Sequence, residues 1–374
     1  MLSPKWFFKE LKEREISFFA GVPDSLLKEF CALLDNTLPP QEHLIAANEG
    51  NAIALATGYH LATGKTGMVY MQNSGLGNTV NPLMSLVAPN VYSIPILLLI
   101  GWRGEPGKLD EPQHITQGAA TLSQLKTLNI PYAILPTEED AVQKCLDTAL
   151  KTLQENKVYA LVVRKNSFSK HKSAPKPKSR KEYALSREDA VRQVASSLHE
   201  RSVIVSTTGK TSRELFEYRA ESNHPQQDFL MVGSMGHASQ IALGIAIQKP
   251  NRQIFCFDGD GALIMHMGGL AVIGAQSLSN FKHIIFNNGA HDSVGGQPTA
   301  TKNLDIPALA RACGYEAKHA ENEKELADAL TWLQKTDTPA LLEIRVKKGA
   351  RADLGRPTQT PHENKQNFMR HLEG

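Results

Sequence analysis

Two short apolar runs separated by a helix-length segment constrain the fold more than any other feature of the sequence. Residues 254–257 lead directly into Asp-Gly-Asp-Gly-Ala, and residues 284–286 lead into Asn-Asn-Gly. Two parallel strands joined by a helix place their carboxyl ends at the same edge of a sheet. Asp260 and Asn288 would then lie side by side, and their oxygens suit a Mg²⁺ ion that holds a phosphate group. The pattern predicts a metal and a phosphate-bearing ligand here, although both runs are also good turn sequences.

Length and composition limit the classes of protein to be considered. The chain has 374 residues, which suits two domains, and its 41% hydrophobic and 21% charged residues are normal for a globular protein. The net charge of +3 gives no indication of nucleic-acid binding. The four cysteines form no Cys-x-x-Cys pair that would suggest zinc or a disulfide framework. With no signal-peptide pattern and no apolar run long enough to cross a bilayer, we expect a soluble cytoplasmic protein without nucleic-acid or membrane partners.

Short Val/Ile/Leu runs alternate with helical stretches on both sides of a Lys-, Pro- and Ser-rich segment at residues 169–182. That segment has no apolar periodicity and is interpreted as an exposed linker. The alternation predicts an α/β protein of two domains, each with a mostly parallel sheet and helices on both faces. The expected strands are residues 17–20, 68–71, 96–100, 133–135 and 160–163 before the linker, and 203–206, 229–232, 254–257, 283–286 and 340–346 after it.

Two glycine-containing loops follow expected strands and open helices. The first, Thr-Thr-Gly-Lys-Thr-Ser at 207–212, is not a P-loop because position 204 is Ile where that motif requires Gly. The second is Gly-Ser-Met-Gly-His-Ala at 233–238. Such a loop offers backbone N–H groups to an anion, although each alone is also a common strand–helix turn. Together with the glycines around Asp260 they predict a diphosphate pocket, with candidate residues Thr208, Gly209, Ser234, Met235, Gly236, Gly259 and Gly261.

A glutamate begins a helix rich in small residues in the N-terminal half. Glu49 stands in Asn-Glu-Gly-Asn-Ala, and Ala, Gly and Thr are frequent in residues 53–63 after it. A glutamate at a helix N-terminus is commonly a dipole or capping residue. A buried carboxyl at the same place could instead share a proton with a ligand nitrogen. The residues alone leave both interpretations open.

These motifs resemble those of thiamine-diphosphate (ThDP) enzymes. The segment at 48–52 is similar to the one that carries the activating glutamate of ThDP-dependent decarboxylases, and Gly-Val-Pro-Asp-Ser at 21–25 is similar to their first substrate-side loop. The order of domains resembles the pyruvate decarboxylase and acetolactate synthase group, but without its middle domain. The resemblance implies a pyrimidine-binding domain at 1–168, a linker at 169–182 and a diphosphate-binding domain at 183–374. The compact form, with the runs at 73–78, 101–107, 110–114 and 288–297, resembles the phosphonopyruvate and sulfopyruvate decarboxylases.

The resemblance implies two cofactors, ThDP and Mg²⁺. The side-chain oxygens of Asp260 and Asn288 and the backbone carbonyl of Ala290 would bind the Mg²⁺, and Gly261 and Ala262 would lie near the diphosphate. Met235 matches the bulky apolar residue against which ThDP bends, although it would also fit a core position. Glu49 would bind the aminopyrimidine ring.

The resemblance also implies a 2-oxo acid as the small-molecule substrate. The leading hypothesis is decarboxylation of 3-phosphonopyruvate to phosphonoacetaldehyde and CO₂, and the alternative is decarboxylation of sulfopyruvate. A non-catalytic ThDP-fold binding subunit is a third hypothesis. A nucleotide-binding dehydrogenase is disfavoured because no Gly-x-Gly-x-x-Gly follows the first expected strand.

Either 2-oxo acid carries a second anion that the pocket must bind. The candidates are the cations Arg103, Lys108 and Lys210 and the polar residues Ser25, Asn73 and Ser74, each of which could also be an ordinary surface or loop residue. The expected proton-handling groups are Asp24, His114 and His291, of which His114 is preferred because it ends the polar run 110–114. In the family the glutamate and the metal site of one active centre come from different subunits, so we expect a homo-oligomer with active sites at the subunit interface.

Overall fold

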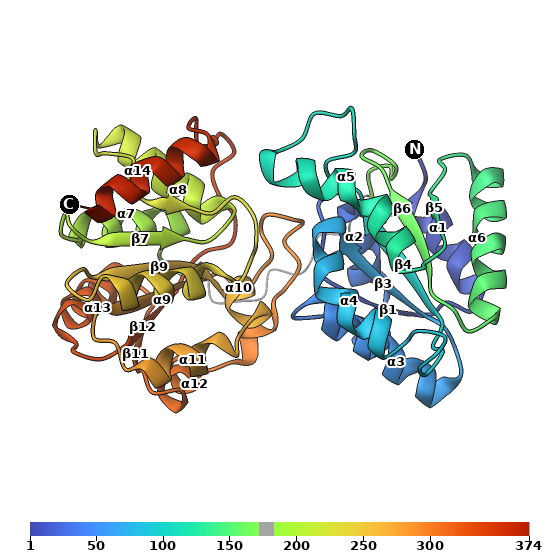
Figure 1. Ribbon diagram of the computed structural model, residues 1–374, viewed down its shortest axis with the longest axis horizontal. Coiled ribbons are helices and arrows are strands. Elements are labelled where there is room, and N and C mark those ends of the chain that lie inside the picture. Colours follow the sequence, from blue (N-terminus) through green and yellow to red (C-terminus); the bar gives the residue numbers. More distant parts are fainter. Residues whose placement is uncertain (172–182, 374) are drawn as a thin grey trace. The chain divides into compact units, whose positions relative to one another are not determined.

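The computed structural model describes residues 1–171 and 183–373, and the chain divides into two compact units, Met1–Pro177 and Lys178–Gly374 (Figure 1). The predicted linker at 169–182 spans the division between the units. Its residues 172–182 lie outside the described residues, and the predicted domain limits of 1–168 and 183–374 stay predictions.

The N-terminal unit alternates strands and helices along the chain. In order, its elements are α1 (Pro4–Glu13), β1 (Phe18–Gly21), α2 (Lys28–Thr37), β2 (His43–Ile45), α3 (Glu49–Thr63), β3 (Gly67–Gln72), η1 (Asn73–Gly75), α4 (Leu76–Ser85), β4 (Ile96–Gly101), α5 (Pro112–Thr127), β5 (Tyr132–Ile134), α6 (Glu139–Gln154) and β6 (Tyr159–Val163).

The C-terminal unit repeats this alternation. Its elements are α7 (Arg187–Ser197), β7 (Val203–Ser206), α8 (Lys210–Glu221), β8 (Phe229–Leu230), α9 (Ala238–Gln248), β9 (Ile254–Gly259), α10 (Asp260–Met265), α11 (Gly269–Gln276), β10 (Phe281–Asn287), η2 (Ala300–Asn303), α12 (Ile306–Ala312), β11 (Glu316–Ala320), α13 (Glu323–Lys335), β12 (Ala340–Arg345) and α14 (Pro361–Glu373).

Each unit contains one six-stranded sheet, and the two sheets have the same strand order. The first sheet runs β2-β1-β3-β4-β6-β5, and the second, taken from its other edge, runs β8-β7-β9-β10-β12-β11. If the strands of each unit are numbered from one to six along the chain, both orders are 2-1-3-4-6-5. Every pairing between these strands is parallel. The predicted architecture of two mostly parallel α/β sheets is therefore confirmed.

Ten of the twelve strands were expected from their apolar runs, and β2 and β11 were not. Both are edge strands, since β2 pairs only with β1 and β11 only with β12 in the described sheets. An edge strand buries fewer side chains, and β11 accordingly carries exposed Glu316, Lys318 and His319. Such a sequence has no continuous apolar run, which is why periodicity alone missed it.

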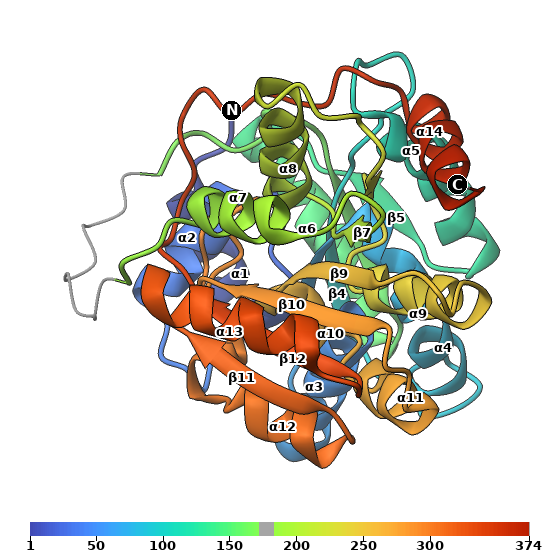
Figure 2. The ribbon, with the colours of Figure 1, turned by 90° about the vertical axis from the view of Figure 1, so that its left-hand side faces the viewer.

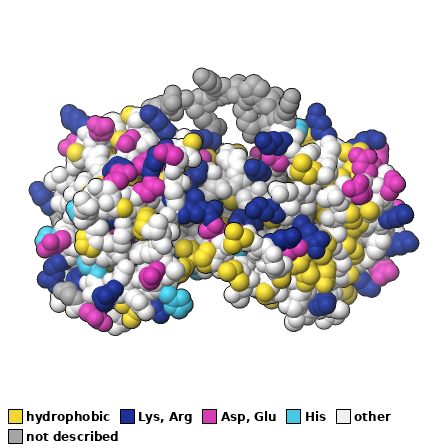
Figure 3. All heavy atoms as spheres, turned by 90° about the horizontal axis from the view of Figure 1, so that it is seen from above, with side chains coloured by type: hydrophobic (Ala, Val, Ile, Leu, Met, Phe, Trp, Pro, Cys, Tyr) yellow, Lys and Arg dark blue, Asp and Glu magenta, His cyan; other side chains and the backbone are white. Residues whose placement is uncertain are grey.

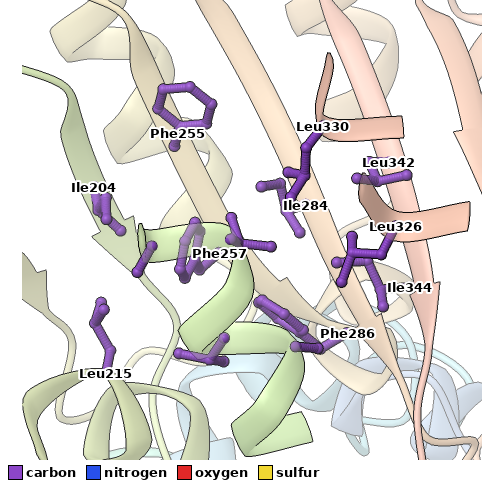
Figure 4. Packing of buried hydrophobic residues seen from close by; sticks show 14 of the residues in the cluster. Ile204, Leu215, Phe255, Phe257, Ile284, Phe286, Leu326, Leu330, Leu342 and Ile344 are labelled. Atoms are coloured by element: carbon purple, nitrogen blue, oxygen red, sulfur yellow. The ribbon is translucent and has the colours of Figure 1, made fainter. Parts of the chain in front are cut away.

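Helices cover both faces of each sheet, as the buried positions show. In the N-terminal unit, α1, α2 and α6 share one apolar cluster with the sheet, and α3, α4 and α5 share the other. In the C-terminal unit, α7, α8 and α13 share one apolar cluster with the sheet, and α9, α11, α12 and α14 share the other. Figure 2 shows α7 and α8 above β9 and α11 and α12 below it. Figure 4 shows the core of the C-terminal unit that α7, α8 and α13 cover, in which Ile284 and Phe286 lie near Leu330 and Leu326, and the ring of Phe257 packs against that of Phe286. These two-sided cores fix the strands, and the strands position the loops at their carboxyl ends.

Figure 3 shows one face of the molecule, on which both basic and acidic side chains occur over each unit. None of the helices within residues 1–171 and 183–373 combines the length and the apolar character that a membrane span requires.

Candidate active site

The predicted site residues gather at the carboxyl ends of strands in both units. In the C-terminal unit they follow β7, β8, β9 and β10, and in the N-terminal unit they lie at or just beyond the ends of β1, β2, β3 and β4. In both units the order 2-1-3 reverses the chain direction across the sheet between β1 and β3, or between β7 and β9. Open parallel sheets bind ligands at such a point of reversal. Each unit therefore carries its own group of candidate site residues.

Asp260 is the first residue of α10, directly after β9. Its side chain is 3% exposed, and Oδ2 accepts hydrogen bonds from the hydroxyls of Thr299 and Thr301, the latter at 2.8 Å. Burial raises the pKa of this carboxyl, and the two threonine hydroxyls oppose the rise. No ion pair to Asp260 is present in the described part of the chain. A buried carboxyl that is hydrogen-bonded but lacks a cationic partner fits a bound metal ion.

Asp258, two residues earlier, has a different role. It is 1% exposed within β9, and Oδ2 lies 3.4 Å from Nε2 of the buried His283 on the neighbouring strand β10. Its Oδ1 accepts the backbone N–H of Gly259 at 2.9 Å. Asp258 therefore belongs to the interior of the sheet, and of the two aspartates only Asp260 lies in the loop region that a ligand can approach.

Asn288 follows β10 and lies next to the strand end that carries Asp260, because β9 and β10 are paired. It is 7% exposed, and its Oδ1 accepts the backbone N–H of Ala290 at 2.9 Å. Its Nδ2 donates to Oδ2 of Asp292 at 2.6 Å. Ala290 is buried and pairs with Pro298 in an isolated bridge. The structure thus brings all three predicted metal-ligand positions to neighbouring strand ends.

Met235 and His291 converge on the turn that contains Asp260. A Cβ atom at Gly261 would lie 3.2 Å from Cε of Met235 and 3.2 Å from Nδ1 of His291, so any larger residue there would displace both. Met235 is half-buried, and Ser234 before it has a left-handed backbone conformation, with φ of 53°. Strain of this kind is common where a loop binds a ligand. The predicted diphosphate loops therefore lie around one turn of the C-terminal unit.

The remaining diphosphate candidates occupy strand–helix turns of the same unit. Thr208 and Gly209 end the turn that opens α8, and Gly209 lies next to the side chain of Ser293 in the loop after β10. Gly236 is buried against His266 at the end of α10. Lys210 is the first residue of α8 and is half-buried.

Glu49 begins α3 in the N-terminal unit. Asn48 caps this helix by accepting the backbone N–H of Asn51 at 2.9 Å, so the carboxyl of Glu49 is not needed as the cap. The side chain of Glu49 is 5% exposed, and Oε2 accepts Nδ2 of Asn78 at 2.7 Å. A Cβ atom at Gly75 would lie 2.5 Å from the carboxyl carbon, so only glycine lets Glu49 occupy this position. A buried carboxyl held in this way fits the proton-sharing role better than the capping role.

Asp24 is fully buried at the carboxyl end of β1. Its Oδ1 accepts Nε2 of Gln72 at 2.7 Å, and its Oδ2 accepts the backbone N–H of Leu26 at 3.0 Å. Burial raises the pKa of the Asp24 carboxyl, while these hydrogen bonds and the positive charge of Arg103 oppose the rise. Ser74 Oγ donates to Oε1 of the same Gln72 at 2.8 Å. Gln72 therefore links two of the predicted site residues.

Arg103 follows β4 and is held by several groups. Its Nε donates to Oδ2 of Asp110 at 2.8 Å, Nη2 donates to Oδ1 of the same carboxyl, and Nη1 donates to Ser25 Oγ at 3.0 Å. Asn73, which is fully buried, holds the backbone of Arg103. Its Nδ2 donates to the Arg103 carbonyl, and its Oδ1 accepts the Arg103 backbone N–H. The guanidinium fork is thus already paired with Asp110. Lys108 lies apart from this group, on an exposed turn.

The two predicted histidines are neutral near pH 7. Burial lowers the pKa of His291 to about 4, and burial together with the charge of Arg103 lowers the pKa of His114 to about 4. Nδ1 of His114 and Nε2 of His291 are buried without a hydrogen-bond partner within the described ranges. A neutral imidazole with a nitrogen in this state can accept a proton from a bound molecule.

Four residues of the site were not assigned from the sequence: Gln72, Thr299, Thr301 and Asp292. Gln72 is the last residue of β3 and directly follows the apolar run at 68–71, which does not by itself indicate a function for it. Thr299 and Thr301 lie after β10, outside the expected strands. No motif in the sequence connects them with Asp260. Asp292 stood inside a recognised run, but its contact with Asn288 depends on a turn that periodicity does not describe.

Comparison with known proteins agrees with this geometry. Family models described as the N-terminal and C-terminal TPP binding domains of thiamine pyrophosphate enzymes match residues 4–125 and 207–344. Phosphonopyruvate decarboxylases of Streptomyces hygroscopicus and Streptomyces viridochromogenes are each 35% identical over 370 residues, which is 94% of this chain and 90% of those proteins. A sulfopyruvate decarboxylase of Methanosarcina acetivorans is 29% identical over 342 residues, or 84% of this chain and 83% of that protein.

Two parallel α/β units with these strand-end residues define a ThDP-dependent enzyme as the class. The chain belongs to the thiamine pyrophosphate enzyme family, within the group that contains the phosphonopyruvate and sulfopyruvate decarboxylases. The resemblance drawn from the motifs is thereby confirmed.

Proposed function

We propose that the protein catalyses the ThDP- and Mg²⁺-dependent decarboxylation of 3-phosphonopyruvate to phosphonoacetaldehyde and CO₂. The observation that carries the proposal is the 35% identity to two phosphonopyruvate decarboxylases along 94% of the chain. Glu49, Asp260 and Asn288 are all present and buried at strand ends. Their presence argues against a non-catalytic binding subunit.

The C-terminal unit would hold Mg²⁺ and the diphosphate. Asp260 and Asn288 offer side-chain oxygens and Ala290 a backbone carbonyl, a donor set that suits Mg²⁺. Met235, beside Gly261, is the apolar residue against which the cofactor would bend. When bound, ThDP supplies an acceptor for the electron pair left when CO₂ departs from the 2-oxo acid.

The N-terminal unit would handle protons and the substrate. Glu49, whose carboxyl is held by Asn78, would contact a nitrogen of the pyrimidine ring of bound ThDP. Asp24 has a raised pKa and is suited to hold a proton near the reacting carbon, and the neutral His114 and His291 are suited to accept one. Of these groups, Asp24 would deliver the proton that replaces the lost carboxylate.

The phosphonate would bind near Arg103. This guanidinium, with Ser25, Asn73 and Ser74 around it, forms a polar group at neighbouring strand ends. Because Asp110 accepts from Nε and Nη2 of Arg103 and Ser25 accepts from one N–H of Nη1, the second N–H of Nη1 is the part suited to a phosphonate oxygen. Lys108 would contribute only if its exposed turn moved towards the substrate.

Rates of CO₂ release from phosphonopyruvate, sulfopyruvate and pyruvate, with and without ThDP and Mg²⁺, test the proposal. We expect phosphonopyruvate to be the best substrate and both cofactors to be required. Sulfopyruvate is the second candidate, because the chain is also 29% identical to a sulfopyruvate decarboxylase. If sulfopyruvate reacts far faster, the substrate assignment is wrong while the ThDP chemistry stands.

We also propose a homo-oligomer in which each active site combines Glu49 of one subunit with Asp260 of another. Mixing the Glu49→Gln and Asp260→Ala variants tests this arrangement. A mixed dimer would regain one intact site, so random assortment should restore about a quarter of the wild-type activity. If the mixture stays inactive while wild-type protein treated in the same way is active, both residues of a site lie in one subunit.

A further inference from the structure

Asn288 has a fixed amide orientation, which decides which of its two ends a cation can use. Its Nδ2 donates to Asp292 Oδ2 at 2.6 Å, and its Oδ1 accepts the N–H of Ala290 at 2.9 Å. A carboxylate accepts only, and a backbone N–H donates only, so the reversed amide would place donor against donor and acceptor against acceptor. The structure therefore leaves Oδ1, the end that can coordinate a metal, as the end not engaged by Asp292.

Asp292 is held in place by groups from two other segments. Its Oδ2 also accepts the backbone N–H of Gly349 at 2.8 Å and lies 3.4 Å from Nη1 of Arg187. Arg187 is 6% exposed and donates through Nε and Nη2 to both oxygens of Glu214, each at 2.8 Å. Glu214 on α8 is 1% exposed. This buried pair joins the start of α7 to α8. It fixes the position of Asp292 and hence of Asn288.

The charges of this group favour a neighbouring cation. Arg187 contributes one positive charge and Glu214 and Asp292 one negative charge each, which leaves one negative charge beside Asn288. Removing residues that orient metal ligands commonly costs 10–100-fold in metal affinity. We propose that Asp292, fixed by the Arg187–Glu214 pair, is the positioning residue that presents Asn288 Oδ1 to Mg²⁺ and sets the affinity of the site for this ion. The inference rests on the proposed ThDP and Mg²⁺ site but not on the identity of the substrate.

The test uses the full-length protein with ThDP and measures metal binding directly. Binding of Mn²⁺ as a probe is followed by electron paramagnetic resonance, and Mg²⁺ competes it off. Asp292→Leu keeps the approximate shape but removes every acceptor, and we expect the dissociation constant for Mg²⁺ to rise about 10–100-fold. Asp292→Asn keeps an oxygen for Asn288 Nδ2 and should weaken binding by less. At saturating Mg²⁺, kcat of both variants should return to within about twofold of the wild type.

A matched control separates this role from a purely structural one. Asp228 is another buried aspartate, 3% exposed and paired with Arg219 at 2.8 Å, but it directly precedes β8, the strand at the edge of the sheet. Asp228→Leu should lower the thermal midpoint of the metal-free protein and leave the Mg²⁺ dissociation constant unchanged. If Asp292→Leu behaves in the same way, the inference is wrong. Asp292→Ala, which leaves room for water, replaces Asp292→Leu should the latter fail to fold.

The outcome for the proposed function is read separately. Wild-type protein that binds Mn²⁺ and ThDP but does not release CO₂ from phosphonopyruvate would overturn the substrate assignment and leave the role of Asp292 to be decided by the binding data. Wild-type protein that binds no Mn²⁺ in the presence of ThDP would overturn both.

Discussion

The two units of this chain share one strand order and carry different chemistry on it. In each, the first four strands along the chain end in loops that hold the site residues. The end of the second strand carries Glu49 in one unit and Met235 in the other. The end of the third carries Asn73 or Asp260, and the end of the fourth carries Arg103 or Asn288. The sheet therefore fixes where the functional residues lie, and the identity of the loop residues determines the chemistry of each unit.

The units also differ in how their buried charges are compensated. In the N-terminal unit Arg103 is paired with Asp110, and its positive charge also opposes the raised pKa of Asp24. In the C-terminal unit Asp260 has hydroxyl partners only in the described part of the chain. A buried carboxyl without a cationic partner is costly unless a cation binds. The buried carboxyl of Asp24 in the N-terminal unit is therefore partly compensated within the chain, whereas we propose that a metal ion compensates Asp260 in the C-terminal unit.

The largest expected effect comes from removing Asp260, the proposed metal ligand of the C-terminal unit. Asp260→Ala should abolish Mg²⁺-dependent ThDP binding and lower kcat/KM by about 10³-fold or more, since a bound metal contributes several kcal/mol of charge stabilisation. Binding of ThDP with and without Mg²⁺ is measured by circular dichroism. Unchanged binding in the variant would show that the two halves do not differ as described.

A smaller loss, of another kind, is expected in the N-terminal unit. Glu49→Gln should retain Mg²⁺-dependent ThDP binding but lower kcat by about 10²–10³-fold, because general acid–base groups typically contribute that much. Steady-state CO₂ release and the same binding titration check both parts. A fully active variant would remove Glu49 from the mechanism, and lost cofactor binding would erase the division of roles between the units.

Substrate recognition should give an intermediate effect on KM. Arg103→Lys loses the fork geometry, so KM for phosphonopyruvate should rise about tenfold with little change in ThDP binding. Lys108→Met, on the exposed turn, is the companion variant and should leave KM within about twofold. An effect confined to Lys108 would move the anion site from the strand end to that turn.

The smallest effect concerns the pH dependence of stability. The unfolded His291 takes up a proton near pH 6.5, whereas the folded one does so only near pH 4. Between these values unfolding binds protons, so the stabilisation is fully present above about pH 6.5 and is lost as the pH falls towards 4, by at most about 3 kcal/mol. Urea midpoints of the metal-free protein at pH 7.5 and pH 5 should therefore differ less in His291→Gln than in the wild type. His362→Gln, at an exposed position of α14, should keep the wild-type difference.

The parts of the molecule that were predictable are those governed by local pattern. Buried strands such as β9 and β10 are visible in the sequence as apolar runs. The residues directly after them could therefore be assigned to one edge of a sheet. Contacts between distant loops were not predictable, because no periodicity links Thr299 to Asp260 or Asp110 to Arg103. In particular, Arg103 was expected to be free for an anionic substrate, but its Nε and Nη2 already donate to Asp110.

The edges of the two sheets set a limit on how copies of this chain can associate. The outermost strands are β2 and β5 in one unit, with three residues each, and β8 and β11 in the other, with two and five. Strands this short, or lined with charged side chains as β11 is, make poor templates for hydrogen bonding to a further strand. Copies of this chain in the proposed homo-oligomer should therefore meet through helices and loops, and no continuous sheet should run from one copy into the next.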